Sequence, residues 1–179
     1  MPDYQKTERV FVFCDAHHFS SLMVELADEQ PAFIQAFYER VGDAVVNRRG
    51  TLIKYIGDAI LSVFPKGTEA EAVECGIEMR RQYAALIEEF GAKTESDLEI
   101  GIGAGEVYFG TFGHPSLRTT DVFGEKVNET AIIMHYRGVA VTEDVKKALG
   151  DRFDLVRQPD VKPKWSDKAV AIWDVQHTL

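Results

Sequence analysis

The chain has 179 residues, of which 45% are hydrophobic, and it carries a formal net charge of -9. This length suits one globular domain with a well-buried core and is too short for two ordinary domains. The acidic balance argues against a broad nucleic-acid surface, because proteins that bind phosphate backbones normally present a basic face. A small anionic ligand remains compatible with this charge, provided that a few lysines or metal ions neutralise the ligand locally.

Neither the cysteines nor the apolar segments indicate secretion or a membrane. Cys14 lies in a strand-like run and Cys75 in a helix-like run, without a CxxC spacing, so we expect two buried, reduced thiols. No apolar stretch approaches the roughly 18 residues that span a bilayer, and the start MPDYQKTERV lacks a signal-peptide core. We therefore expect a cytoplasmic protein with neither a membrane nor a nucleic acid as partner.

Strand-like and helix-like segments alternate through the first part of the chain. Gly57-Asp58 fits a two-residue hairpin turn between two apolar runs, because glycine accepts positive φ. In chain order, hydrophobic spacing predicts a strand (9–15), a short helix (from Ser20 to near Pro31), a longer helix (33–45), strands 51–56 and 59–64, a helix (69–91), and strands 98–105 and 106–113. The order β, α, β, β, α, β is that of a ferredoxin-like unit.

The rest of the chain reads as an elaboration of that unit, since no repeat or Pro/Gly/Ser-rich linker separates it. Its predicted elements are a strand (119–124), a helix (125–136), a strand (139–142), a helix (143–150), and strands 153–157 and 169–175. We expect one α+β domain over residues 1–179, with a ferredoxin-like βαββαβ core, a C-terminal elaboration and residues 1–7 as a leader.

Two aspartates are expected to meet in this topology. The first strand of a ferredoxin-like sheet lies beside the third, so Asp15 at the end of the first strand and Asp58 in the hairpin become neighbours. Paired carboxylates repel unless one is protonated or a cation lies between them, and hard oxygen ligands suit Mg²⁺ or Mn²⁺. Alternatively, Asp15 caps a helix and Asp58 serves only the turn.

Four collinear segments resemble the catalytic domain of class III nucleotidyl cyclases: FVFCDAHHFSSL, GTLIKYIGDAILSVF, LEIGIGAGEVYFGTFGHPSLR and TTDVFGEKVNETA. The resemblance runs from about residue 8 to residue 175 and implies a class III cyclase-like sandwich. It implies two Mg²⁺ or Mn²⁺ ions held by Asp15 and Asp58, with Ala16 beside them. The following amides, at His18, Phe19 and Ser20, would hold the β- and γ-phosphates at a helix N-terminus.

The resemblance also assigns base recognition to Lys54 and Asp121. Lys54 can donate to ring N1 of adenine, and Asp121 can accept from the 6-amino group. Guanine presents the reverse at both points, so the pair favours ATP over GTP. Otherwise, Lys54 is a solvated strand lysine and Asp121 a turn residue.

Further positions of the family motif are matched in part. Asn128 corresponds to the asparagine that positions the ribose, but Ile132 stands where the family commonly has a transition-state arginine, a loss worth about 10²- to 10³-fold. Arg137, His135 or a partner-chain residue could substitute, although Arg137 would leave a continuing helix on another face.

Lys164 is the candidate lysine for binding the triphosphate, and Lys162 is a competing candidate. His17 and His18 replace a small residue and a glycine, either as extra phosphate or metal contacts or as a loop variation.

The family works as head-to-tail dimers, which implies a homodimer whose sites combine metal aspartates of one chain with Lys54, Asp121 and Asn128 of the other. The sequence thus predicts an adenylate cyclase that makes 3′,5′-cyclic AMP, slow because of Ile132. Two alternatives remain open: a cyclase for GTP or a pyrimidine nucleotide, and a nucleotide-binding or dimerisation module that has lost turnover.

Overall fold

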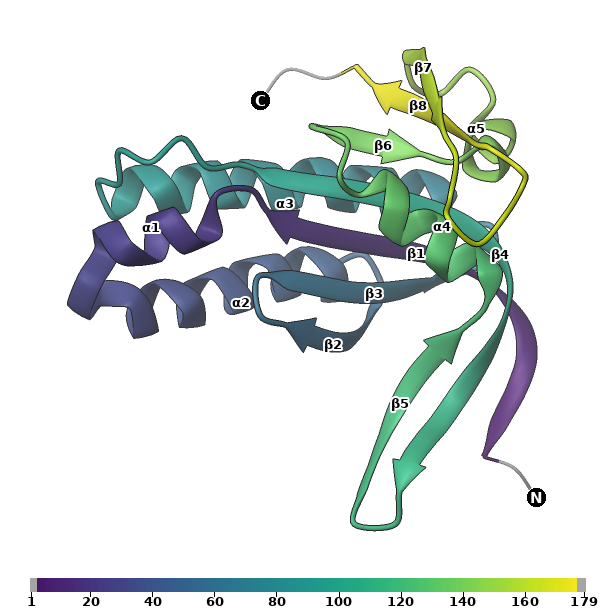
Figure 1. Ribbon diagram of the computed structural model, residues 1–179, viewed down its shortest axis with the longest axis horizontal. Coiled ribbons are helices and arrows are strands. Elements are labelled where there is room, and N and C mark those ends of the chain that lie inside the picture. The colour runs from purple at the N-terminus through teal and green to yellow at the C-terminus, as the bar shows by residue number, and fades with distance from the viewer. Residues whose placement is uncertain (1–2, 177–179) are drawn as a thin grey trace.

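The structure, a computed structural model, describes residues 3–176 and shows an α+β fold built on one eight-stranded sheet (Figure 1). The fold class predicted from the sequence is therefore confirmed. The elements in chain order are β1 (Tyr4–Ala16), α1 (Phe19–Leu26), the short 3₁₀ helix η1 (Ala27–Glu29), α2 (Gln30–Val46), β2 (Thr51–Ile56), β3 (Ala59–Pro65), α3 (Glu69–Glu89), β4 (Leu98–His114), β5 (Leu117–Phe123), α4 (Glu125–Ile133), β6 (Val139–Val141), α5 (Glu143–Leu149), β7 (Leu155–Val161) and β8 (Val170–Val175).

The strand order β2-β3-β1-β4 reproduces the predicted ferredoxin-like core. β1 lies between β3 and β4 and is antiparallel to both. The sheet continues from β4 through β6 and β8 to β7, and β5 pairs with β4 off this path. The central position of β1 brings its carboxyl end close to the β2–β3 hairpin on one side and to the start of β4 on the other.

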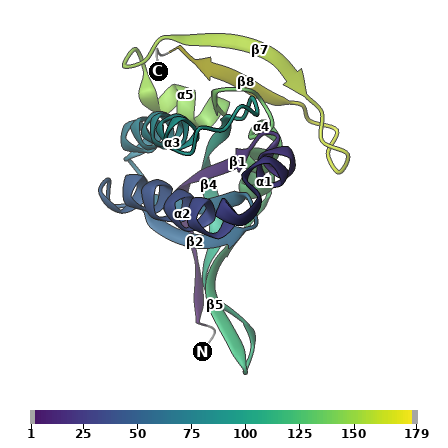
Figure 2. The ribbon, with the colours of Figure 1, turned by 90° about the vertical axis from the view of Figure 1, so that its left-hand side faces the viewer.

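Helices cover both faces of the sheet, because β1 is apolar on both sides. Val10, Val12 and Cys14 join the core under α2 and α3, whereas Phe11 and Phe13 join the core under α4. Figures 1 and 2 show α2 and α3 together, with α4 across the sheet from them. Since side chains alternate along a strand, Asp15 follows Phe11 and Phe13 onto the α4 face.

Small residues in β4 let α4 approach the sheet closely. A Cβ at Gly101 would lie 2.6 Å from the carbonyl oxygen of Thr130 and 2.8 Å from the backbone nitrogen of Met134. Any larger residue at Gly101 would therefore push the end of α4 away from the sheet. This close packing brings the turn that follows α4 over the first residues of β4.

Several predicted boundaries differ from the structure. The expected strands 98–105 and 106–113 are one continuous strand, because β1 begins at Tyr4, inside the expected leader, and pairs with β4 as far as Gly110. The predicted helix 125–136 ends at Ile133, and the predicted strand 153–157 is β7, which runs on to Val161. The distal part of β4 and β5 form an arm that projects from the sheet (Figure 2).

Within residues 3–176, no helix combines the length and apolar character that crossing a membrane requires.

Candidate active site

Asp15 and Asp58 lie on neighbouring segments, as the topology predicts. The register of β1 and β3 places Asp15 opposite Ala59, so Asp58 is one residue from the position facing it. Asp15 is partly buried, and burial raises the pKa of its carboxyl group, an effect that the nearby Asp58 charge strengthens. The two carboxylates therefore repel each other, and a cation between them would relieve this repulsion.

A third carboxylate faces Asp15 from the other side. The register of β1 and β4 pairs Asp15 with Glu99, which is only 7% exposed. Burial raises the pKa of Glu99, whereas His17 and His135 lower it. Potential ligand atoms of Asp15, Glu99 and His135 all lie within 4.8 Å of one another.

Glu99 is not among the site residues that the sequence predicts, although a signal for it exists. It is the acidic residue in the otherwise apolar run LEIGIG, and the ferredoxin-like order places that strand beside the one ending at Asp15. An acidic residue in a buried strand beside a candidate metal ligand therefore indicates a further candidate ligand.

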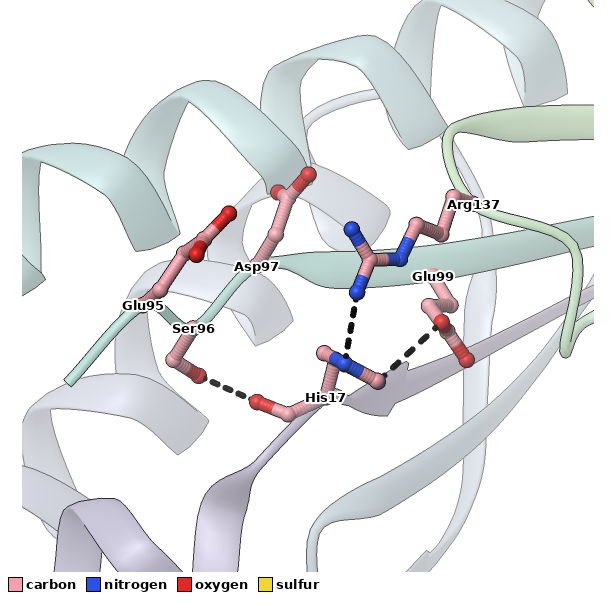
Figure 3. A pocket seen from close by; sticks show the side chains of 6 residues that line it. All are labelled: His17, Glu95, Ser96, Asp97, Glu99 and Arg137. Atoms are coloured by element: carbon pink, nitrogen blue, oxygen red, sulfur yellow. Dashed lines mark hydrogen bonds and ion pairs between the residues drawn. The ribbon is translucent and has the colours of Figure 1, made fainter.

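A small cavity of about 80 Å³ opens beside Glu99 (Figure 3), and it is lined by His17, Glu95, Ser96, Asp97, Glu99 and Arg137. The His17 ring lies between two of these groups, with Nδ1 3.4 Å from Glu99 Oε1 and Nε2 3.0 Å from Arg137 Nη2. The backbone of His17 is also held, since Ser96 Oγ donates to its carbonyl oxygen at 2.6 Å. His17 is thus a fixed part of this wall.

The N-terminus of α1 follows directly after β1. His18 adopts a left-handed conformation with φ 57, and its carbonyl accepts the first helical hydrogen bond, from Leu22 N–H at 3.0 Å. The N–H groups of Phe19 and Ser20 lie in the first helical turn, where an α-helix leaves its donors without internal acceptors. The His17 N–H is not available in the same way, because it donates to the Asp97 carbonyl at 2.9 Å.

Lys54 and Asp121 form an ion pair within one protomer. Lys54 in β2 and Asp121 in β5 are 67 residues apart, yet Lys54 Nζ lies 2.7 Å from Asp121 Oδ2. The other Asp121 oxygen accepts the Val122 N–H at 2.8 Å, and Lys54 Nζ lies 5.7 Å from the centre of the Phe123 ring. The folded chain therefore brings the two candidate base-reading residues to one point beside an aromatic ring.

The remaining predicted residues lie around this centre. Asn128 is exposed on α4, and Ile132 lies one turn later on the same helix. Arg137 lies beyond the end of α4, so the prediction that it leaves on another face of a continuing helix is wrong. Lys164 is exposed in the loop between β7 and β8, where the competing Lys162 pairs with Asp167 at 3.2 Å.

The comparison with known families agrees with this arrangement. A family model described as the adenylate and guanylate cyclase catalytic domain matches residues 3–173. The chain belongs to this family. The resemblance to class III cyclases is thereby confirmed over nearly the whole length of the chain, and the chain is a nucleotidyl cyclase catalytic domain by descent.

Relatives include enzymes described with either purine specificity. An adenylate cyclase from Anabaena cylindrica is 28% identical over 92% of this chain, which spans only 36% of that relative's length. The adenylyl cyclase CyaB from P. aeruginosa superposes with a TM-score of 0.86 at 20% identity, covering 99% of this chain and 98% of that one. The guanylyl cyclase Cya2 gives a TM-score of 0.82 at 26% identity, covering 96% and 92%. The fold alone thus leaves the base undecided in this cyclase domain.

The acidic end of the site has the donor chemistry that a divalent cation requires. Cyclase domains of this family generally use divalent metals, and carboxylate oxygens are the ligands that Mg²⁺ and Mn²⁺ prefer. Asp15 and Asp58 supply such oxygens from adjacent segments, and burial together with the Asp58 charge raises the pKa of Asp15, effects that a bound cation would offset. The residues present therefore fit the metal.

Proposed function

We propose that this cyclase domain converts ATP into 3′,5′-cyclic AMP and pyrophosphate at the interface of a homodimer. The choice of ATP rests on one observation, the 2.7 Å contact between Lys54 and Asp121. A donor and an acceptor held side by side match the edge of adenine, which offers an acceptor at N1 and a donor at the 6-amino group. Guanine would face Lys54 with the N1 donor and Asp121 with the O6 acceptor, so neither protein group could hydrogen-bond to the base, a loss of about 1.5–3 kcal/mol for each hydrogen bond to a charged group.

The reaction needs one bond formed and one broken. The ribose 3′-oxygen attacks the α-phosphorus and loses its proton, while the bond from that phosphorus to the α,β-bridging oxygen breaks and pyrophosphate leaves. Asp15 and Asp58 would hold two Mg²⁺ or Mn²⁺ ions, with Ala16 beside them. When bound, such ions lower the pKa of the attacking hydroxyl and stabilise charge on the phosphates.

The other candidate residues would position the substrate. Asn128 on α4 would orient the ribose, and the first-turn amides of α1, from Phe19 and Ser20, would bind the phosphates together with His18 and Lys164. His18 Nδ1 lies 3.0 Å from the Glu95 carbonyl, which keeps its ring at this helix end. Phosphate oxygens accept hydrogen bonds, so the donors of a helix N-terminus match them.

We assign the two halves of each site to different protomers. The aspartates of one chain would face Lys54, Asp121 and Asn128 of the partner, and the reverse arrangement would give a second site. This explains how Lys54 and Asp58, four residues apart in one hairpin, can serve different steps of recognition and catalysis. A monomer would then be inactive.

Ile132 favours a second candidate function, a nucleotide-binding module without turnover. An aliphatic side chain there cannot donate to the charge that develops on the transferred phosphate. Arg137 is one candidate substitute within the chain, but its guanidinium is engaged with His17 at 3.0 Å.

One assay distinguishes these functions. The purified protein is incubated with each of the four ribonucleoside triphosphates and Mn²⁺, and the products are identified by chromatography and mass. We expect cyclic AMP from ATP and its loss in Asp58→Ala, with the exposed Asp43→Ala as a matched control. Another cyclic nucleotide would overturn the base assignment, and binding without any product would establish the non-catalytic module.

A further inference from the structure

In the part of the chain that the structure describes, Glu99 is a buried carboxylate whose side chain makes no short hydrogen bond. Its side chain is 9% exposed, and two imidazole nitrogens lie beside it, His17 Nδ1 at 3.4 Å and His135 Nδ1 at 4.0 Å. Both distances exceed those of ordinary hydrogen bonds. Burying a charged group with such weak compensation is costly, so this carboxylate favours a cation in its vicinity.

His17 lies behind Glu99 and is itself held by Arg137. The guanidinium of Arg137 can only donate, so the His17 Nε2 at 3.0 Å accepts from it. In the neutral ring the hydrogen is then on Nδ1, which lies 3.4 Å from Glu99 Oε1 (Figure 3). Such a chain of supporting groups is typical of carboxylates that bind metals.

His135 completes a mixed set of donors. It lies in the turn after α4, its side chain is 66% exposed, and its ligand atom is within 4.8 Å of those of Asp15 and Glu99. Two carboxylates with one imidazole differ from the all-oxygen set that Mg²⁺ prefers, because imidazole suits Zn²⁺ and similar transition metals.

We propose that Asp15, Glu99 and His135 form a Zn²⁺ site, with water as the fourth ligand. With metal–ligand bonds of about 2.0–2.1 Å, tetrahedral ligand atoms lie about 3.3 Å apart, so separations of up to 4.8 Å must shorten by up to about 1.5 Å on binding. His135 can supply this movement, since it is exposed and lies outside the helix. Neither Glu99 nor His135 belongs to the residues that the cyclase motif assigns to the catalytic metals.

The site shares Asp15 with the proposed catalytic pair. If the proposed cyclase function holds, Zn²⁺ at this site withdraws Asp15 from Asp58 and inhibits turnover. Because imidazole prefers Zn²⁺ to Mg²⁺, Zn²⁺ would then inhibit the domain even when Mg²⁺ is present at a concentration that supports activity. This regulatory consequence rests on the proposed function, whereas the Zn²⁺ site does not.

The test measures binding of Zn²⁺ alone. Isothermal titration of the metal-free, untagged chain without nucleotide should give one Zn²⁺ per chain. Removing one protein ligand in His135→Ala or Glu99→Gln should weaken the affinity at least about 10-fold, an effect comparable to the loss of supporting groups at metal sites. The matched controls, Asp43→Asn and His114→Ala, both alter exposed residues outside the site and should keep the affinity within about 2-fold of that of the unaltered chain.

Two results would overturn the proposal: unchanged Zn²⁺ affinity in His135→Ala, or affinity that depends on Asp58 and not on His135. Glu99→Gln alters a buried group, so its fold is checked by circular dichroism, while the exposed His135 provides an independent variant. Because no nucleotide is present, Zn²⁺ binding through His135 in a protein without cyclase activity would refute the proposed function and support this site.

Discussion

The two halves of the candidate site differ in how their charges are balanced. Lys54 and Asp121 carry opposite charges and contact each other at 2.7 Å. Asp15, Asp58 and Glu99 carry like charges and gather where β1 meets its neighbours, and burial raises the pKa of both Asp15 and Glu99. The folded chain thus satisfies the first half by itself, whereas the second half requires a cation to hold its charges together.

The largest effect on activity is expected from removing a carboxylate from the half of the site that contains Asp15, Asp58 and Glu99. Asp58→Ala should lower cyclic AMP formation by about 10²- to 10³-fold, because an electrostatic contribution to the transition state is lost. Product formation with Mn²⁺ measures this, with Asp43→Ala as the control. Activity close to that of the unaltered chain would contradict the assignment of Asp58 to the metals.

Ile132→Arg should act in the opposite direction. A guanidinium one turn after Asn128 would donate to the charge developing on the phosphate, and we expect turnover to rise by about 100-fold. Steady-state kinetics should show the gain in kcat rather than in KM, since the interaction forms only in the transition state. Ile132→Lys is a charge-matched control with a different donor geometry, and unchanged turnover in Ile132→Arg would count against this explanation.

Mixing two inactive variants tests whether the halves come from different protomers. Asp58→Ala and Asp121→Ala have their defects in opposite halves, so a heterodimer contains one intact site and one doubly defective site. Random pairing should restore about a quarter of the original activity. No recovery, despite heterodimers confirmed by native mass spectrometry, would exclude the shared sites.

The sequence predicted those parts of the site that depend on strand order and local motif. The βαββαβ order was sufficient to place Asp15 near Asp58, because neighbouring strands follow from it. Glu99 was missed because its importance comes from the β1–β4 register, which pairs it with Asp15. The long-range contact between Lys54 and Asp121 was implied only by family resemblance, since no local pattern links residues on β2 and β5.

Helix ends were the weakest prediction, and one of them affects function. The apolar pattern of 125–136 continues past the end of α4, but Gly101 packs against the backbone of Thr130 and Met134 where the helix stops. Tertiary packing decides this boundary, so local propensity could not reveal it. The consequence is that His135 and Arg137 lie in a turn and face Glu99 and His17.

Lys54→Glu tests the half of the site that contains Lys54 and Asp121. The new carboxylate would face Asp121 instead of pairing with it, and it could no longer donate to N1 of adenine. We expect cyclic AMP formation to fall at least about 10-fold. The stability cost should be small, because Lys54 is 37% exposed and such ion pairs contribute about 1 kcal/mol or less. Lys147→Glu on α5 is the surface control, and equal loss in both variants would contradict a specific role.

The smallest effect is expected in the melting temperature of the metal-free chain. The pKa of Asp15 is raised from its ordinary value of 3.8, so the charged group costs stability at neutral pH. This cost declines as the pH falls through the raised pKa toward 3.8, where the folded chain binds the proton first. Asp15→Asn should therefore raise the melting temperature at pH 7 by a few degrees, and the gain should shrink on acidification.

Asp15→Asn, which should be more stable than the unaltered chain without metal, should gain less stability when metal is added. Mn²⁺ at about 100 times its dissociation constant should stabilise the unaltered chain by about 2.7 kcal/mol, and Asp15→Asn should lose most of this gain. Lys54→Ala, in the half that needs no cation, should retain it. Scanning calorimetry with and without Mn²⁺ measures both responses. If Asp15→Asn lowered stability without metal, repulsion would not dominate the acidic half, and the contrast between the two halves would fail.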